Sequence, residues 1–131
     1  MHIVTVSMND TGIVEQMARL LTAGFRAVAP DSWTTIEEAR ETVRTVVDSG
    51  FARAALDDAG DVIGWVGGLP QYDGNVWELH PLVVAAAAQG RGVGRALVLD
   101  LEEQVRARGG LTVLLGSDDQ TSSTTLSDAD L

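Results

Sequence analysis

Three stretches of the chain repeat apolar residues at intervals of three and four, a pattern that predicts helices with one buried face. The first stretch ends at Pro30, the second at Gly50 and the third at Gly109-Gly110. Thr34 and Glu37 form a capping-box pattern that is expected to begin the second helix. The third helix turns a single row of residues inward, which comprises Val93, Leu97, Leu101 and Val105.

Other stretches are short and either rich in β-branched residues or wholly apolar, which predicts strands. They span residues 2–6, 51–56, 62–69, 77–84 and 111–115. Asp57-Asp58-Ala59-Gly60 is typical of a hairpin turn, and residues 70–75 are expected to form the next turn. The third helix connects the last two strands by a right-handed crossover, so these two strands should be parallel. This order of elements predicts one α/β (α+β) domain over residues 1–131.

The composition narrows the class of protein. No apolar run approaches the ~20 residues that span a bilayer, so no membrane partner is expected. The residues after Met1 show neither a basic start nor a long apolar stretch, so no signal peptide is expected. With no cysteine and only two histidines, neither disulfides nor a metal site is indicated. A cytoplasmic protein without a metal is the simplest expectation.

The charge of the chain is acidic and unevenly distributed. A net charge of −10 argues against nucleic acid as a partner, because phosphates require a basic surface. Every basic residue is an arginine, and the last is Arg108. All charged residues after it are acids. These acids are Asp118, Asp119, Asp128 and Asp130. Two interpretations stay open, namely solubility or a field that attracts a cationic substrate.

A glycine-rich turn precedes the third helix. Its pattern, Gln89-x-x-Gly92-x-Gly94, places free N–H groups and the positive end of a helix dipole where they can bind an anion. Arg91 and Arg95 add positive charge. The turn lacks the Lys-Ser/Thr pair of a nucleotide P-loop and the full spacing of a dinucleotide fingerprint. A pyrophosphate ligand is favoured over a merely tight turn.

The strand before this turn carries two titratable groups. A period of two places Trp77, Leu79 and Pro81 on one face, and Glu78, His80 and Leu82 on the other. Glu78 and His80 beside an anion site suggest acid–base chemistry, although His80 can equally be a structural histidine. Pro81 removes a hydrogen bond from the sheet, which predicts an edge or a bulge and leaves neighbouring N–H groups for a ligand.

These features resemble a known family. The order of elements and the glycine turn are similar to the GNAT superfamily of acetyl-CoA-dependent N-acyltransferases, and several blocks resemble the aminoglycoside 6′-N-acetyltransferases in particular. The blocks are residues 69–72, 77–84, 108–110, 115–119 and 124–127. The first half of the chain resembles the family in layout more than in sequence. The resemblance implies a GNAT fold, with a mixed central sheet and helices on both faces.

The resemblance also implies roles for the central residues. It places the pyrophosphate of acetyl-CoA at Gln89, Gly90, Arg91, Gly92, Val93, Gly94 and Arg95. The pantetheine arm would pair with the backbone of Leu82, Val83 and Val84. Glu78 would be the general base, acting through water on the ammonium group of the substrate. The N–H of Leu82 would stabilise the oxyanion, and His80 would orient substrate, water or base.

An aminoglycoside substrate would give the acids a purpose. Asp118, Asp119 and Asp31 would bind its ammonium groups, and Trp33 and Tyr72 would pack against its sugar rings. The chain departs from the family pattern at Thr121, where an acid is usual, and in lacking a further helix and two strands with the tyrosine that protonates the thiolate. We therefore expect an incomplete C-terminus. A homodimer through the unfinished sheet, another cationic amine as substrate, and a CoA-binding form without full activity stay open.

Overall fold

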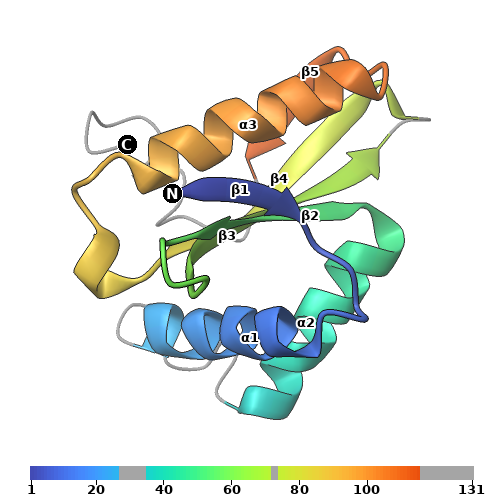
Figure 1. Cartoon of the computed structure of the whole chain (residues 1–131). Coiled ribbons are helices and arrows are strands. Elements are labelled where there is room, and N and C mark those ends of the chain that lie inside the picture. Colours follow the sequence, from blue (N-terminus) through green and yellow to red (C-terminus); the bar gives the residue numbers. More distant parts are fainter. Residues whose placement is uncertain (27–34, 72–73, 116–131) are drawn as a thin grey trace.

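The computed structural model describes residues 1–26, 35–71 and 74–115, which form a sheet covered by helices on both faces (Figure 1). The elements are β1 (His2–Thr5), α1 (Thr11–Arg26), α2 (Ile36–Ser49), β2 (Phe51–Leu56), β3 (Val62–Gln71), β4 (Val76–Val84), the 3₁₀ helix η2 (Ala86–Ala88), α3 (Val93–Ala107) and β5 (Thr112–Leu115). Helices α1 and α2 lie on one face and α3 lies on the other. The predicted order and the α+β class are confirmed.

The sheet has the strand order β1-β2-β3-β4-β5. Strands β1 to β4 pair in an antiparallel manner, and β5 pairs with β4 in parallel, as the crossover through α3 predicts. The sheet is therefore mixed. Strand β3 continues to Gln71, so Pro70 pairs with Trp77 inside the sheet and does not belong to the predicted turn.

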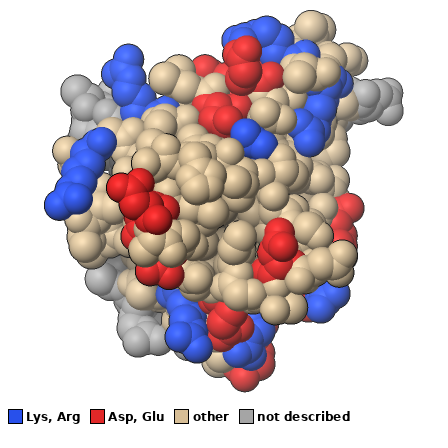
Figure 2. Space-filling view, in the orientation of Figure 1, with Lys and Arg blue, Asp and Glu red and all other residues tan. Residues whose placement is uncertain are grey.

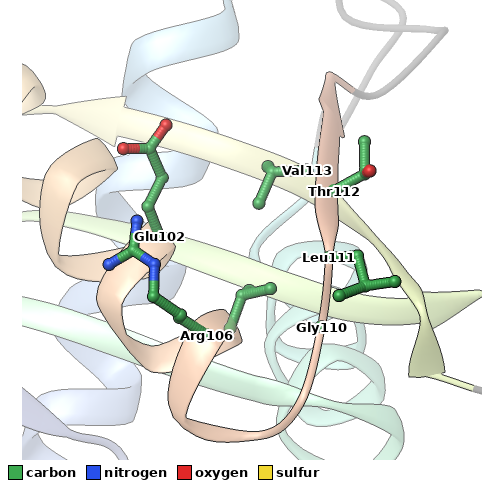
Figure 3. Close-up of a pocket in the computed structure, with 7 residues that line it drawn as sticks. Glu102, Arg106, Gly110, Leu111, Thr112 and Val113 are labelled. Atoms are coloured by element: carbon green, nitrogen blue, oxygen red, sulfur yellow. The ribbon is translucent and has the colours of Figure 1, made fainter.

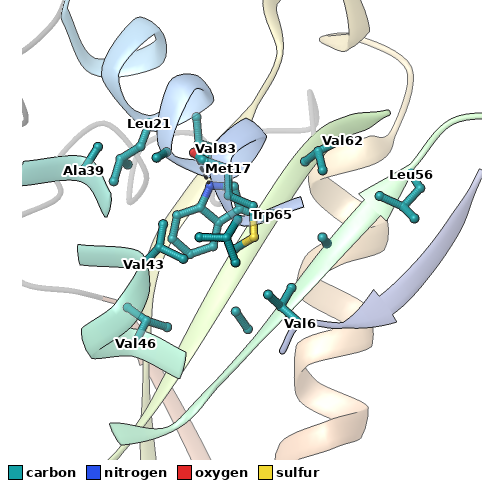
Figure 4. Close-up of a cluster of buried hydrophobic side chains, with 14 residues drawn as sticks. Val6, Met17, Leu21, Ala39, Val43, Val46, Leu56, Val62, Trp65 and Val83 are labelled. Atoms are coloured by element: carbon teal, nitrogen blue, oxygen red, sulfur yellow. Dashed lines mark hydrogen bonds between the residues drawn. The ribbon is translucent and has the colours of Figure 1, made fainter. Parts of the chain in front are cut away.

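Two apolar cores hold the helices to the sheet. Under α1 and α2, Trp65 is fully buried, and its indole N–H donates a hydrogen bond to the carbonyl of Met17 at 3.1 Å (Figure 4). Under α3, the buried row is the predicted one, comprising Val93, Leu97, Leu101 and Val105. The rings of Phe51 and Trp77 meet beneath this helix with their centroids 5.4 Å apart.

The beginning of α2 differs from the prediction by one residue. The capping box consists of Thr35 and Glu38, since the Glu38 N–H donates to the Thr35 hydroxyl and the Thr35 N–H donates to the Glu38 carboxylate. The predicted box of Thr34 and Glu37 is wrong. Both pairs fit the sequence pattern, and the pattern cannot choose between adjacent registers. The structure selects the second because α2 begins at Ile36.

Strand β4 carries one extra residue at His80–Pro81. Val66 pairs with Leu82 and Gly68 pairs with Leu79, so two steps along β3 match three steps along β4. Of the two alternatives predicted from Pro81, an edge or a bulge, the structure shows the bulge. Because of the extra residue, side chains after the bulge point to the face opposite the one that simple alternation predicts. Leu82 therefore packs in the α3-side core with Trp77 and Leu79, and the prediction that it shares a face with Glu78 is wrong.

Gly67 lies opposite the bulge because the backbone approaches too closely for a side chain. A Cβ atom at this position would lie 2.5 Å from the carbonyl oxygen of His80 and 2.5 Å from a methyl group of Val46. Neither neighbour is free to withdraw, since one is backbone and the other belongs to the buried core. The glycine thus permits the bulge and α2 to meet at one point.

We predict that Gly67→Ala lowers the free energy of unfolding by about 2 kcal/mol, because the added methyl group overpacks this contact. Chemical denaturation measures the change. Gly12→Ala is the matched control, since a Cβ at Gly12 in α1 meets nothing within 4 Å. The control should leave stability unchanged or slightly raised. Equal effects of the two substitutions would contradict the close contact.

An ion pair joins α1 to α2 on the surface. The guanidinium of Arg40 donates to both carboxylate oxygens of Glu15, at 2.8 and 2.9 Å. These hydrogen bonds lower the pKa of the Glu15 carboxyl below its usual value of 4.5. A lowered pKa in the folded state means that the pair stabilises the fold only while Glu15 is ionised.

We predict that Glu15→Gln lowers the urea midpoint at neutral pH. The stabilisation is present above the pKa of the unfolded chain and is lost as the pH falls through the lower folded-state pKa. The difference from wild type should therefore shrink once the pH falls below about 4. Glu41→Gln is the control, because Glu41 lies 4.0 Å from Arg44 within α2 and, among the described residues, pairs with no other element. A pH-independent difference for Glu15→Gln would contradict the assignment.

Candidate functional site

The candidate site lies along β4 after the bulge, beyond the residues that pair with β5 in the described part of the chain. In the described part of the chain, β5 pairs with Val76 to Leu79 of β4 and not with the residues after the bulge. The N–H of Ala85 donates to the carbonyl of Ile63 on β3 at 2.9 Å. Because bonding alternates along an antiparallel pair, Val83 also bonds to β3, whereas the N–H groups of Leu82 and Val84 point away from β3. These two groups face the side of β4 on which β5 lies, beyond the last described pair of Leu79 and Leu115.

The glycine turn follows directly and leads into α3. Gly90 and Gly92 have φ angles of 79° and 82°, in the left-handed region that favours glycine. Gly92 is the N-cap of α3 and provides no side chain to bond the first turn. The N–H groups of Val93, Gly94 and Arg95 therefore lack the intrahelical partners that later residues have. The turn thus offers the free N–H groups on which the prediction of an anion cradle depends, and Arg91 and Arg95 are exposed beside it.

Gln89 ties this turn back to the strand. Its side-chain amide donates to the carbonyl of Val84 at 3.1 Å. That carbonyl points away from β3, in agreement with the alternation described above. The side chain of Val93 is buried in the α3-side core, which leaves only its backbone N–H facing the cradle. The end of β4 and the start of α3 are thus joined by the hydrogen bond of Gln89 and by the packing of Val93 in the core.

Glu78 lies on β4 on the face opposite Trp77 and Leu79, the face of α1 and α2. Its carboxylate is half-buried and accepts a hydrogen bond from the side-chain amide of Gln71 at 3.3 Å. Sequence reasoning missed this partner because it placed Gln71 in a turn. The register gives the signal, since Leu69 pairs with Glu78 and Gln71 lies two positions further along the same face.

His80 follows Glu78 by two positions, at the start of the bulge, and is also half-buried. The structure therefore brings Glu78, His80 and Leu82 together on one strand, but with the Leu82 side chain on the other face. The predicted substrate residues Asp31, Trp33, Tyr72, Asp118 and Asp119 lie outside the described residues, as does Thr121. Within residues 1–26, 35–71 and 74–115, no group of three or more acidic or histidine side chains could hold a metal ion.

Surface charge and shape complete the description. Figure 2 shows arginine and acidic side chains interspersed over α3 and again over α1 and α2. A hollow of about 220 Å³ lies between the C-terminal end of α3 and β5, where Glu102, Arg106 and residues 110–113 line it (Figure 3). It is at the far end of α3 from the glycine turn and does not belong to the cradle. No helix in the described segments is both long and apolar enough to cross a membrane.

Comparison with known proteins identifies the class. Residues 14–124 match the acetyltransferase (GNAT) family, and the chain belongs to this family. No curated protein matches the chain. The resemblance stated from the sequence is therefore confirmed at the level of the family and its fold.

Solved structures give a finer likeness. An aminoglycoside 6′-N-acetyltransferase complexed with coenzyme A is 32% identical, with a TM-score of 0.76 over 88% of this chain and 61% of that one. The enzyme from Enterococcus faecium is 33% identical, with a TM-score of 0.75 over 91% and 63%. An aminoglycoside 6′-acetyltransferase type Ii is 34% identical, with a TM-score of 0.75 over 91% and 73%. The chain thus spans about three-fifths to three-quarters of the length of these proteins.

Proposed function

We propose that this chain transfers an acetyl group from acetyl-CoA to the 6′-amine of an aminoglycoside, a reaction that confers antibiotic resistance. One observation carries the proposal. Glu78, a half-buried residue, lies on the same strand as the backbone N–H groups of Leu82 and Val84, which point away from β3, next to a glycine turn that opens a helix. The identity of 32–34% to aminoglycoside 6′-acetyltransferases supports the choice of substrate.

The cofactor would lie along β4 after the bulge and over the start of α3. Its pyrophosphate would accept hydrogen bonds from the N–H groups at the start of α3, where the helix dipole favours negative charge. Its pantetheine arm would pair with the outward-facing backbone of Leu82 and Val84. Gln89 supports this arrangement by holding the turn against β4. Glycine at positions 90 and 92 leaves room for the phosphates, since a Cβ there would point into open space.

The reaction would proceed by direct attack. Glu78 would take a proton, through water, from the substrate ammonium, and Gln71 would hold the carboxylate in place. The neutral amine would then attack the thioester carbonyl, and the Leu82 N–H would donate to the developing oxyanion. Collapse would break the C–S bond and form the amide, and the CoA thiolate would take up a proton. His80 would orient substrate, water or base from its position two residues after Glu78.

The acidic character of the chain suits a polycationic substrate. A net charge of −10 raises the local concentration of cations. Asp31, Asp118 and Asp119 would contact the ammonium groups, and Trp33 and Tyr72 the sugar rings. A homodimer is a further proposal, for which the exposure of Leu111 and Leu114 at β5 provides an apolar edge.

A second candidate is binding of acetyl-CoA without full activity on any amine. Its support is the glycine turn at the start of α3, which offers N–H groups to a phosphate. The cradle and the backbone of Leu82 and Val84 lie within the described residues. The acceptor-binding residues proposed above do not, apart from Glu78.

An acceptor assay tests the proposed function. Release of free CoA is measured with a kanamycin-type aminoglycoside that bears a 6′-amine and with its analogue in which a hydroxyl replaces that amine. Only the amine should support turnover. Turnover with both compounds would reject the 6′ position, and turnover with peptide or polyamine amines alone would reject the aminoglycoside. Binding of acetyl-CoA without turnover on any amine would establish the second candidate.

We predict that Gly92→Asp weakens CoA binding by at least about tenfold, because it places a side chain and a negative charge at the pyrophosphate. Calorimetric titration with CoA measures the effect. Gly109→Asp is the matched control, since Gly109 has a φ of 85° at the other end of α3 and equally open surroundings. The two variants share the cost of backbone strain, so equal losses of binding would contradict the cradle.

We predict that Glu78→Gln lowers turnover by about a hundredfold or more and leaves CoA binding intact. Without a base, only substrate amine that is already neutral can react, so the remaining rate should rise steeply with pH. Steady-state kinetics across pH measure both effects. Glu103→Gln, on the exposed side of α3, should behave as wild type. An unchanged rate for Glu78→Gln would remove this carboxylate from the mechanism.

A further inference from the structure

An enclosed ion pair joins the sheet to α3. Arg53 of β2 donates to the two carboxylate oxygens of Asp100 of α3, at 2.6 and 3.0 Å. Its third nitrogen donates to the hydroxyl of Thr5 on β1. The two charged side chains are only 14% and 18% exposed, and they lie beside an otherwise apolar interface. All three guanidinium nitrogens of Arg53 are therefore satisfied by two other elements.

Such a pair contributes little net stability, because desolvation of both charges offsets much of their attraction. The pair differs from apolar contacts because its hydrogen bonds fix the orientation of the two side chains. The planar guanidinium accepts a carboxylate in a fixed, two-pronged geometry, whereas aliphatic side chains pack with little directional preference. The apolar row of α3 repeats every four residues, so a shift of the helix by about 6 Å would bring equivalent side chains over the sheet. Arg53 and Asp100 select one of these positions.

The position of α3 matters because its first turn forms the cradle. Asp100 lies eight residues after Gly92, or about 12 Å along the helix axis. The helix between them is continuous, so a displacement at Asp100 moves the N–H groups at the cradle relative to β4. Gln89 holds the turn to β4 from the other side. The cradle is thus fixed by one polar contact on each side.

We propose that Arg53 and Asp100 are positioning residues for the cofactor, which set the start of α3 against the outward-facing backbone of Leu82 and Val84. This inference rests on the proposed function, because it assumes that CoA occupies the cradle. The two residues do not contact the cofactor. They act through the helix, and their effect should appear in cofactor affinity more than in the chemical step.

The test replaces the pair with apolar residues in Arg53→Met/Asp100→Leu. Replacement of both partners leaves no uncompensated charge, so the melting temperature should stay unchanged or rise. The dissociation constant for CoA should nevertheless increase about tenfold, and kcat at saturating acetyl-CoA should stay within about twofold. The matched control is Arg106→Met/Glu103→Leu, which removes an exposed ion pair of 3.1 Å on the same helix. The control should leave the affinity for CoA unchanged.

Arg53→Lys provides a second variant that keeps the charge and the fold. It retains the attraction to Asp100 but not the two-pronged geometry, so it should show a smaller loss of affinity at the same melting temperature. Wild-type affinity in both the double variant and Arg53→Lys would overturn the inference while the proposed function stands. A loss of affinity that follows a loss of stability in every variant would also overturn it. Failure of the wild-type chain to bind CoA would instead overturn the proposed function.

Discussion

The extra residue of β4 at His80–Pro81 determines where each functional group of the site lies. Before the bulge, Glu78 faces α1 and α2; after it, the side chain of Leu82 joins the core under α3. The described pairing with β5 reaches Leu79, the residue before the bulge. A carboxylate and outward-facing N–H groups therefore follow one another along a single strand. Gly67 permits this because its missing side chain leaves room for the carbonyl of His80.

The second half of the site depends on the placement of a helix. An anion cradle at a helix N-terminus works only if the N–H groups reach the part of the ligand that carries the charge. Apolar packing holds α3 to the sheet, but it is weakly directional. Polar contacts fix the position of α3. Gln89 bonds the turn to β4, and Asp100 of α3 bonds Arg53 of β2. The chain belongs to the acetyltransferase (GNAT) family, whose enzymes use acetyl-CoA.

Features that depend on the local sequence pattern could be predicted from the sequence. Contacts that depend on how distant segments pair could not. The helical row of Val93 to Val105 and the parallel crossover follow from periodicity, and both are confirmed. The face of Leu82 was predicted wrongly because a proline indicates a bulge but not which side chains it turns over. Gln71 was missed because its bond to Glu78 requires the strand register. Arg53 and Asp100 lie 47 residues apart, and no sequence pattern links them.

Amide hydrogen exchange tests most directly whether the part of β4 after the bulge binds the cofactor. Exchange rates of individual amides are measured by NMR with and without CoA. The amides of Leu82 and Val84 should exchange rapidly in the free protein and slow markedly on binding, whereas Val83, already bonded to β3, should change little. Protection confined to the first turn of α3, with Leu82 and Val84 unaffected, would contradict the role assigned to the bulged strand.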